Sequence, residues 1–159
     1  MKIKTIGLSV ALSLAAGALC FGSPALGTWK LNEAKSIFEP GQARNLTVVY
    51  AEVPGDLVKI TTDGVDKNGK PTHSEWTGKF DGKDYPVTGD PNSDARLYKQ
   101  IDANTLDFIV EKDGEVIMGG KVSIAADGKT RTVTTSGTDP DGKRFKNMAF
   151  YDKVEESKK

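Results

Sequence analysis

The sequence predicts an all-β protein, an antiparallel up-and-down meander of about eight to ten strands that closes into a barrel. From Gly27 onward, apolar and polar residues alternate with a period of two, which is typical of strands with one buried face. Asp-Gly pairs interrupt the alternation at the intervals of β-hairpins. A segment of the chain also recurs further along, which favours a sheet built twice from one unit.

The N-terminal residues 1–25 are predicted to be a cleaved signal peptide. Two lysines precede an uncharged apolar run over residues 6–21, which is shorter than the ~20 residues that a membrane span needs. The small residues Ser23 and Ala25 fit the preference of signal peptidase, so we predict cleavage after Ala25, with Gly22 as the alternative. We therefore expect one domain over 26–159 that is periplasmic or secreted and has no membrane span.

Composition excludes several classes of partner. Cys20 is the only cysteine and lies within the predicted signal, so the mature chain has no disulfide and depends on its core. Acidic and basic residues are equal in number, and loss of the two leader lysines leaves a slightly acidic protein. Nucleic acid and anionic lipid select a basic surface. We expect a monomer with no nucleic-acid partner and no cofactor.

Ten strands are expected in consecutive antiparallel order. The predicted ranges are 28–31, 44–53, 57–66, 71–80, 84–88, 95–101, 105–112, 115–125, 130–138 and 144–154. Turns such as Asp81-Gly82 and Asp141-Gly142 supply residues that tolerate positive φ, as tight hairpins require. The connection over 32–42 could contain a short helical turn.

An internal repeat supports this order. The sequence TTDGVD at 61–66, followed by Gly-Lys, recurs as TTSGTD at 134–139, again followed by Gly-Lys. The same offset places Gly55 on Gly128 and Val49 on Val122. Two copies of a three-strand meander would explain the match, and so would a general likeness among hairpins with Asp-Gly turns.

The period of two assigns side chains to a buried face. The expected inward positions are Leu46, Val48, Tyr50, Val58, Ile60, Trp76, Gly78, Phe80, Leu106, Phe108, Val110, Val116, Met118, Val122 and Ile124. On the last strand, the row from Phe145 to Tyr151 and the row from Lys146 to Phe150 are both partly apolar, so its inner face stays open. The candidate ligand-binding residues are Trp29, Tyr50, Ile60, Trp76, Phe108, Met118, Arg131 and Phe150.

The two ends of the chain resemble a known superfamily. Gly27-Thr28-Trp29-Lys30-Leu31 and Phe150-Tyr151-Asp152-Lys153-Val154 look like the first and last strands of the calycins, the lipocalins and fatty-acid-binding proteins. The chain also resembles small secreted bacterial lipocalin-like proteins that share the Gly-Thr-Trp-Lys-Leu-Asn start. The resemblance implies a lipocalin-like barrel in which Trp29 closes one end. It covers the two ends and the meander.

The resemblance also implies specific partners. Trp29 would pack against a basic side chain from the last strand, for which Arg144 and Lys146 are the candidates. Fatty-acid-binding proteins hold a carboxylate with an arginine two residues before a tyrosine, but here Ala149 stands at that position before Tyr151. Arg131 on the preceding strand could replace the missing arginine or could equally lie on the surface.

The residue inventory offers little material for catalysis. His73 is the only histidine, and alternation places it on the opposite face from Trp76, beside Glu75, as a solvated strand residue. The acidic segments 63–68 and 139–141 lack the spacing of a calcium loop, so we expect no metal. We therefore expect a protein that is not an enzyme. A catalytic role would need His73 inside a pocket near Glu75.

Two functions are compatible with these observations. The first is an exported, non-enzymatic binding protein that holds a small apolar or amphipathic molecule inside the barrel. The second is a structural or protein-interaction module of the cell envelope that uses an outer strand face or an edge, with residues 84–91 as an irregular rim.

Overall fold

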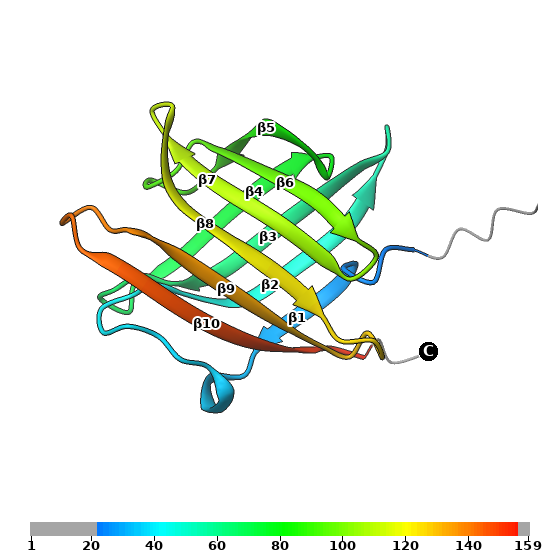
Figure 1. Ribbon diagram of the computed structural model, residues 1–159, viewed down its shortest axis with the longest axis horizontal. Coiled ribbons are helices and arrows are strands. Elements are labelled where there is room, and N and C mark those ends of the chain that lie inside the picture. Colours follow the sequence, from blue (N-terminus) through cyan, green and yellow to red (C-terminus); the bar gives the residue numbers. More distant parts are fainter. Residues whose placement is uncertain (1–21, 156–159) are drawn as a thin grey trace, which may run out of the picture.

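The computed structural model describes residues 22–155, so most of the predicted signal peptide lies outside the described residues. The described chain forms one closed barrel of ten strands, with a single short 3₁₀ turn, η1 (Glu33–Lys35) (Figure 1). The strands are β1 (Gly27–Leu31), β2 (Arg44–Val53), β3 (Leu57–Val65), β4 (Pro71–Gly78), β5 (Asp81–Thr88), β6 (Ala95–Asp102), β7 (Thr105–Lys112), β8 (Glu115–Ile124), β9 (Thr130–Thr138) and β10 (Arg144–Lys153). The all-β prediction is confirmed.

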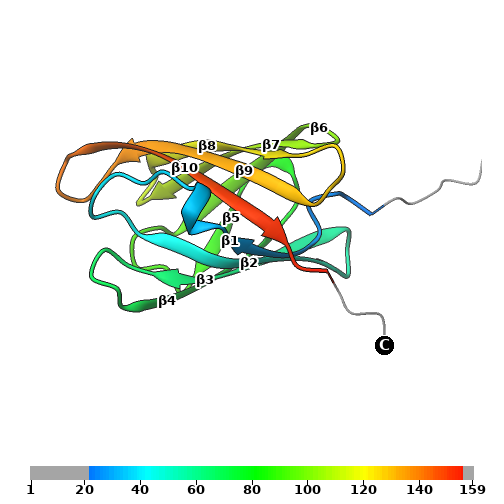
Figure 2. The same ribbon diagram turned by 90° about the horizontal axis from the view of Figure 1, so that it is seen from below.

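Every strand pairs antiparallel with its neighbours in sequence, and β1 pairs with both β2 and β10 to close the barrel. Figure 2 shows the barrel flattened into two layers, with β2–β4 in one and β7–β9 in the other. The predicted meander is therefore correct. Within residues 22–155, no helix is long and apolar enough to cross a membrane.

Two predicted details of β5 and its connections are wrong. Asp81-Gly82 does not form the turn after β4, because β5 already begins at Asp81, which pairs with Lys99 of β6. The irregular rim also lies later than 84–91, since 84–88 belong to β5. The loop that follows is fixed by Arg96, whose Nη2 donates to Asp90 Oδ2 at 2.9 Å.

The repeat is present in three dimensions. In the β3–β4 turn, Asp66 Oδ1 accepts hydrogen bonds from the backbone N–H groups of Asn68 at 2.8 Å and Lys70 at 2.9 Å. In the β9–β10 turn, Asp139 Oδ1 accepts from the N–H groups two and four residues later, at 3.0 and 2.8 Å. Lys67 Nζ lies 3.2 Å from Asp141 Oδ2, so the two turns meet at one end of the barrel.

The predicted match of Val49 with Val122 is wrong because of a β-bulge. The register of β2 against β3 shifts between Asn45 and Thr47, which adds one residue to β2. Beyond the bulge, Tyr50 pairs with Ile60 of β3, as Val122 pairs with Val133 of β9. Tyr50, and not Val49, is therefore the structural equivalent of Val122.

Two glycines at equivalent positions of the repeat lie tightly against the backbone of the neighbouring strand and give a testable prediction. A Cβ on Gly64 would overlap the carbonyl oxygen of Arg44, and a Cβ on Gly137 would overlap that of Ile117. We expect Gly64→Ala and Gly137→Ala each to lower the free energy of unfolding by about 1–3 kcal/mol, because backbone must move. Urea denaturation measures this loss.

The matched control for these glycine variants is Gly119→Ala. A Cβ at Gly119 would meet only the Phe108 carbonyl oxygen, at 3.5 Å, which is ordinary contact. We expect this variant to unfold at the same urea concentration as the unmodified protein or slightly above it. A Gly119→Ala loss as large as that of Gly64→Ala would contradict the steric argument.

The core occupies the barrel interior and follows most of the predicted faces. Its buried apolar members are Ala25, Trp29, Val48, Tyr50, Ile60, Trp76, Val87, Tyr98, Leu106, Phe108, Val110, Val122, Ile124, Ala149 and Tyr151. Val116 is an exception: its side chain is 62% exposed, because a register shift between Val110 and Glu111 turns it outward. On β10, the row that contains Ala149 and Tyr151 faces inward.

Candidate binding site inside the barrel

One arginine lies inside the barrel at the end where Trp29 is buried. Arg131 on β9 is 3% exposed. Its guanidinium carbon lies 4.7 Å from the ring centroid of Trp29 and 4.8 Å from those of Tyr50 and Tyr151. The four side chains come from β9, β1, β2 and β10, which are consecutive around the barrel wall (Figure 1). We call this group the arginine cage.

Strand register explains why these residues meet. Arg131 pairs with Tyr151 across β9 and β10, and on the other side it pairs with the buried Ile124 of β8. Directly opposed residues of adjacent strands project from the same face. Arg131 therefore points inward with its two neighbours, and the surface alternative for Arg131 is wrong.

The guanidinium of Arg131 is short of hydrogen-bond partners. Its Nε and Nη1 atoms are buried and have no partner among residues 22–155. No carboxylate within the same range forms an ion pair with it. Three aromatic faces attract the cation, but they do not replace the lost hydrogen bonds. The arginine cage therefore presents unused N–H donors inside the barrel.

Trp29 also contacts a second basic residue, Lys153. Its indole Nε1 donates a hydrogen bond to the Ala25 carbonyl oxygen at 2.8 Å. Lys153 Nζ lies 5.1 Å from the Trp29 ring centroid and donates to the Pro24 carbonyl oxygen at 3.2 Å. Burial lowers the pKa of Lys153, and the charge of Arg131 lowers it further.

The predicted basic partners of Trp29 are wrong. Arg144 and Lys146 are exposed and begin β10 at the far end from Trp29. Trp29 pairs directly with Lys153, at the opposite end of β10, and Arg131 reaches it from β9. The resemblance to calycins pointed to the last strand, but could not supply the register that brings Arg131 into place.

An aromatic cluster continues from the arginine cage along the interior. Phe80 lies 6.4 Å from Tyr50 and stacks on Trp76 with the ring centroids 6.2 Å apart. Tyr98 contacts Trp76 edge-on at 4.8 Å and Phe108 at 5.8 Å. Centroid separations of 4.8–6.4 Å are those of packed aromatic pairs, so these rings contact one another across the interior and form an apolar surface next to the arginine cage.

The structure places seven of the eight predicted ligand-binding residues inside the barrel. Trp29, Tyr50, Ile60, Trp76, Phe108 and Arg131 are buried, and Met118 packs against the core while partly exposed. Phe150 is the exception. It lies between the inward residues Ala149 and Tyr151 on β10, so its side chain is on the outer face.

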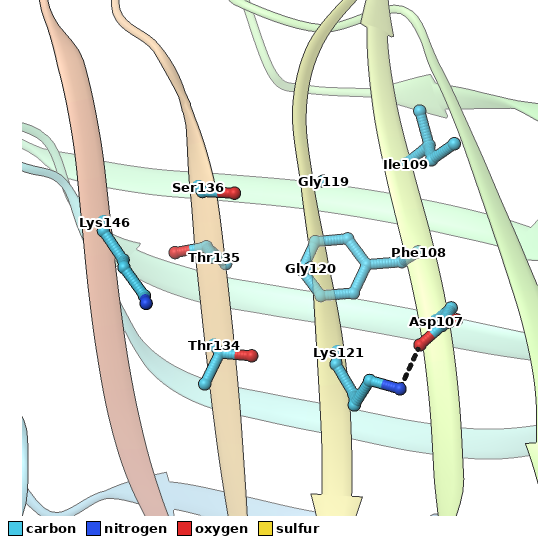
Figure 3. Close-up of a pocket in the computed structure, with 10 residues that line it drawn as sticks. All are labelled: Asp107, Phe108, Ile109, Gly119, Gly120, Lys121, Thr134, Thr135, Ser136 and Lys146. Carbon is cyan, nitrogen blue, oxygen red and sulfur yellow. Dashed lines mark ion pairs between the residues drawn. The ribbon is translucent and has the colours of Figure 1, made fainter.

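A separate hollow lies on the outer face of β7–β10 and was not predicted from the sequence. It has a volume of about 440 Å³ and opens widely to solvent. Figure 3 shows the residues that line it: Asp107, Phe108, Ile109, Gly119, Gly120, Lys121, Thr134, Thr135, Ser136 and Lys146. Gly119 leaves the space open, because a Cβ there would meet only the Phe108 carbonyl oxygen, at 3.5 Å. Lys121 Nζ pairs with Asp107 Oδ1 at 3.1 Å beside it. In the sequence, the Gly119-Gly120 pair within an apolar strand was the signal that could have indicated this hollow.

His73 lies on the outer face, as predicted. Its side chain is 56% exposed, with Nδ1 2.6 Å from Asp63 Oδ1 and Nε2 3.8 Å from Glu75 Oε1. Glu75 pairs mainly with Lys59 Nζ at 2.8 Å, and this hydrogen bond lowers the pKa of Glu75. Between residues 22 and 155, no group of three or more His, Cys, Asp or Glu residues is arranged to hold a metal.

Buried tyrosines predict a loss of stability in alkaline solution. Burial raises the pKa of Tyr98 and raises that of Tyr151 to about 12. The unfolded value is about 10, so the unfolded chain loses these protons first. Their contribution to stability is complete below pH 10; that of Tyr151 disappears as the pH rises through about 12, and that of Tyr98 disappears at still higher pH.

Tyrosinate absorbance and circular dichroism, followed together through this range, test the prediction. We expect delayed ionisation that coincides with loss of the barrel, and a smaller alkaline loss in Tyr151→Phe. Full ionisation near pH 10 with the barrel intact would contradict it.

Comparisons with known proteins leave the family open. No protein-family profile matches the chain, and no curated protein matches it. Among solved structures, one described as EF1p2_mFAP2b bound to DFHBI has 12% identity and a TM-score of 0.48, covering 82% of this chain and 94% of that one. A redesigned beta barrel, mFAP1, bound to DFHBI has 15% identity and a TM-score of 0.43, covering 79% and 94%. The fold assignment depends on the strand pairing itself.

Proposed function

We propose that this protein is an exported, non-enzymatic binding protein that holds a small amphipathic molecule inside the barrel. The apolar part of the ligand would contact the aromatic cluster, and an anionic group would bind Arg131. The observation that carries this proposal is the buried Arg131 guanidinium, whose Nε and Nη1 atoms have no hydrogen-bond partner among residues 22–155.

The chemistry of Arg131 selects an anion. A guanidinium offers planar, paired N–H donors that fit a carboxylate or a similar oxyanion. The charge-assisted hydrogen bonds would form in a site shielded from water by Trp29, Tyr50 and Tyr151. Such bonds contribute about 1.5–3 kcal/mol. An uncharged molecule could not use these donors as fully.

The resemblance to lipocalin-like calycins supports the same proposal. Gly27 and Trp29 lie on the first strand, and Trp29 packs against basic side chains as that resemblance implies. Ala149 stands where the fatty-acid-binding proteins have arginine, and Arg131 offers the cation from β9 instead. Export rests on the apolar leader.

Titration with an anionic naphthalene sulfonate dye tests the proposal. We expect saturable binding at one site with quenching of tryptophan fluorescence, and displacement by a medium-chain alkyl carboxylate. The alkyl alcohol of equal length should displace the dye at least about tenfold less well. Equal displacement by alcohol and carboxylate would contradict the role of Arg131, and absence of saturable binding would contradict the binding function.

The outer hollow on β7–β10 favours a second candidate, an interaction module of the cell envelope. Its lining combines the apolar Ile109 with Lys121 and Lys146 on one exposed sheet face. Crosslinking through Lys146 would identify such a partner, and Gly119→Trp, which fills the hollow, should abolish the crosslink. If this happens and the dye does not bind, the module is the correct function.

A further inference from the structure

The residues just before β1 close one end of the barrel. Ser23–Leu26 form a turn in which the Leu26 N–H donates to the Ser23 carbonyl oxygen at 3.0 Å. Ala25 in this turn is 1% exposed and belongs to the hydrophobic core. We call this turn the N-terminal plug. It lies at the same end of the barrel as Trp29 and the end of β10 (Figure 1).

Two hydrogen bonds from side chains of the barrel hold the plug in place. The Ala25 carbonyl oxygen accepts from the indole of Trp29, which is itself fully buried. The Pro24 carbonyl oxygen accepts from Lys153. Gly27 then turns the chain with a φ of +110°, and a Cβ there would lie 2.8 Å from Lys153 Cε.

Cleavage after Ala25 would remove Ser23, Pro24 and Ala25 from this plug, and with them both accepting carbonyl oxygens. The indole N–H of Trp29 would stay buried without an acceptor, and an unsatisfied buried donor is costly. The new α-ammonium would be on Leu26, next to Gly27, where a Cβ would lie 3.7 Å from Lys153 Nζ. The pKa of Lys153 is already lowered by burial and by Arg131. A further positive charge at this position would be repelled.

We propose that the leader is removed at the bond between Gly22 and Ser23, so that Ser23–Leu26 remain in the mature protein as its N-terminal plug. This inference rests on the proposed export. Cys20 and Gly22 provide small residues at the third and first positions before the bond, as signal peptidase requires. The folded domain therefore begins before the boundary at residue 26 that the sequence alone suggested.

N-terminal sequencing and intact mass of the protein secreted from cells that express the full chain test this assignment. We expect the mature sequence to begin Ser-Pro-Ala. A start at Leu26 would overturn the inference while leaving export correct. A full-length chain retained inside the cell would instead contradict the export on which the inference depends.

A second measurement tests the plug without any export. Chains released from a removable tag to begin at Ser23 or at Leu26 should differ in melting temperature, with the shorter chain several degrees lower. In Trp29→Phe, which has no indole donor, the difference between the two lengths should shrink. Equal melting temperatures of the two native-sequence chains would overturn the proposed structural role of Ser23–Ala25.

Discussion

Arg131→Met is expected to weaken binding of an anionic probe by about tenfold or more while changing the free energy of unfolding by no more than about 1–2 kcal/mol. The probe loses its charge-assisted hydrogen bonds. The fold loses the cation and, with it, the cost of burying that cation. Methionine keeps an unbranched side chain of similar length against Trp29 and Tyr50.

Two opposing contributions explain the small change in stability. Contacts with three aromatic rings favour the folded state by about 0.5–2 kcal/mol each. Removing a cation from water costs several kcal/mol, and each unpaired N–H group adds about 1–3 kcal/mol. Nε and Nη1 of Arg131 have no partner in the described part of the chain, so the cost opposes the gain from the ring contacts and keeps the net contribution of Arg131 to stability small.

Arg96→Met is the matched comparison. Arg96 Nη2 lies 2.9 Å from Asp90 Oδ2, and both side chains are largely buried. Its replacement leaves Asp90 without its cation, so we expect a loss of about 1–3 kcal/mol. Urea denaturation and dye titration of both variants provide the measurements. If Arg131→Met unfolds far more easily than Arg96→Met, Arg131 is present for stability and the binding role is wrong.

Trp29→Ala is expected to cause the largest loss of stability, about 3–5 kcal/mol. Trp29 is completely buried and joins the core, the arginine cage and the N-terminal plug. Removing the indole leaves a cavity at the closed end of the barrel and takes away the donor to Ala25. Thermal and urea unfolding measure the effect.

Two further variants separate the causes of this loss. Trp29→Phe keeps an aromatic ring and removes the N–H group, so its loss should be markedly smaller than that of Trp29→Ala. Phe150→Ala removes an aromatic residue from the outer face of β10, where truncation leaves no buried cavity. Near-equal stability of Trp29→Ala and Phe150→Ala would show that Trp29 does not organise the core.

The sequence was most informative where a structural preference is local. Alternation located the strands, and it correctly placed Trp76 and Phe108 inside and His73 outside. It failed at Val116 and in matching Val49 to Val122, because a β-bulge changes the side of the sheet on which the following residues lie. A bulge depends on pairing with the neighbouring strand, which a single strand does not encode.

The candidate site shows the same division. Trp29, Tyr50 and Arg131 were each named from the sequence, but their convergence on one point was not. The end motifs correctly suggested a basic partner for Trp29 on the last strand, but this partner is Lys153 and not Arg144 or Lys146, and the structure adds Arg131 from β9. The outer hollow depends on side chains from four strands and had only a Gly-Gly pair as its signal.

By itself, the sequence determined the strands, their consecutive antiparallel order and most of the buried face, because φ preferences and side-chain alternation act between near neighbours. Only the tertiary structure decided that Arg131 lies among three aromatic rings without a hydrogen-bond partner in the described chain, and that Ala25 belongs to the core. Both facts depend on closure of the barrel, which brings β1 against β10 and places residues from opposite ends of the chain in contact.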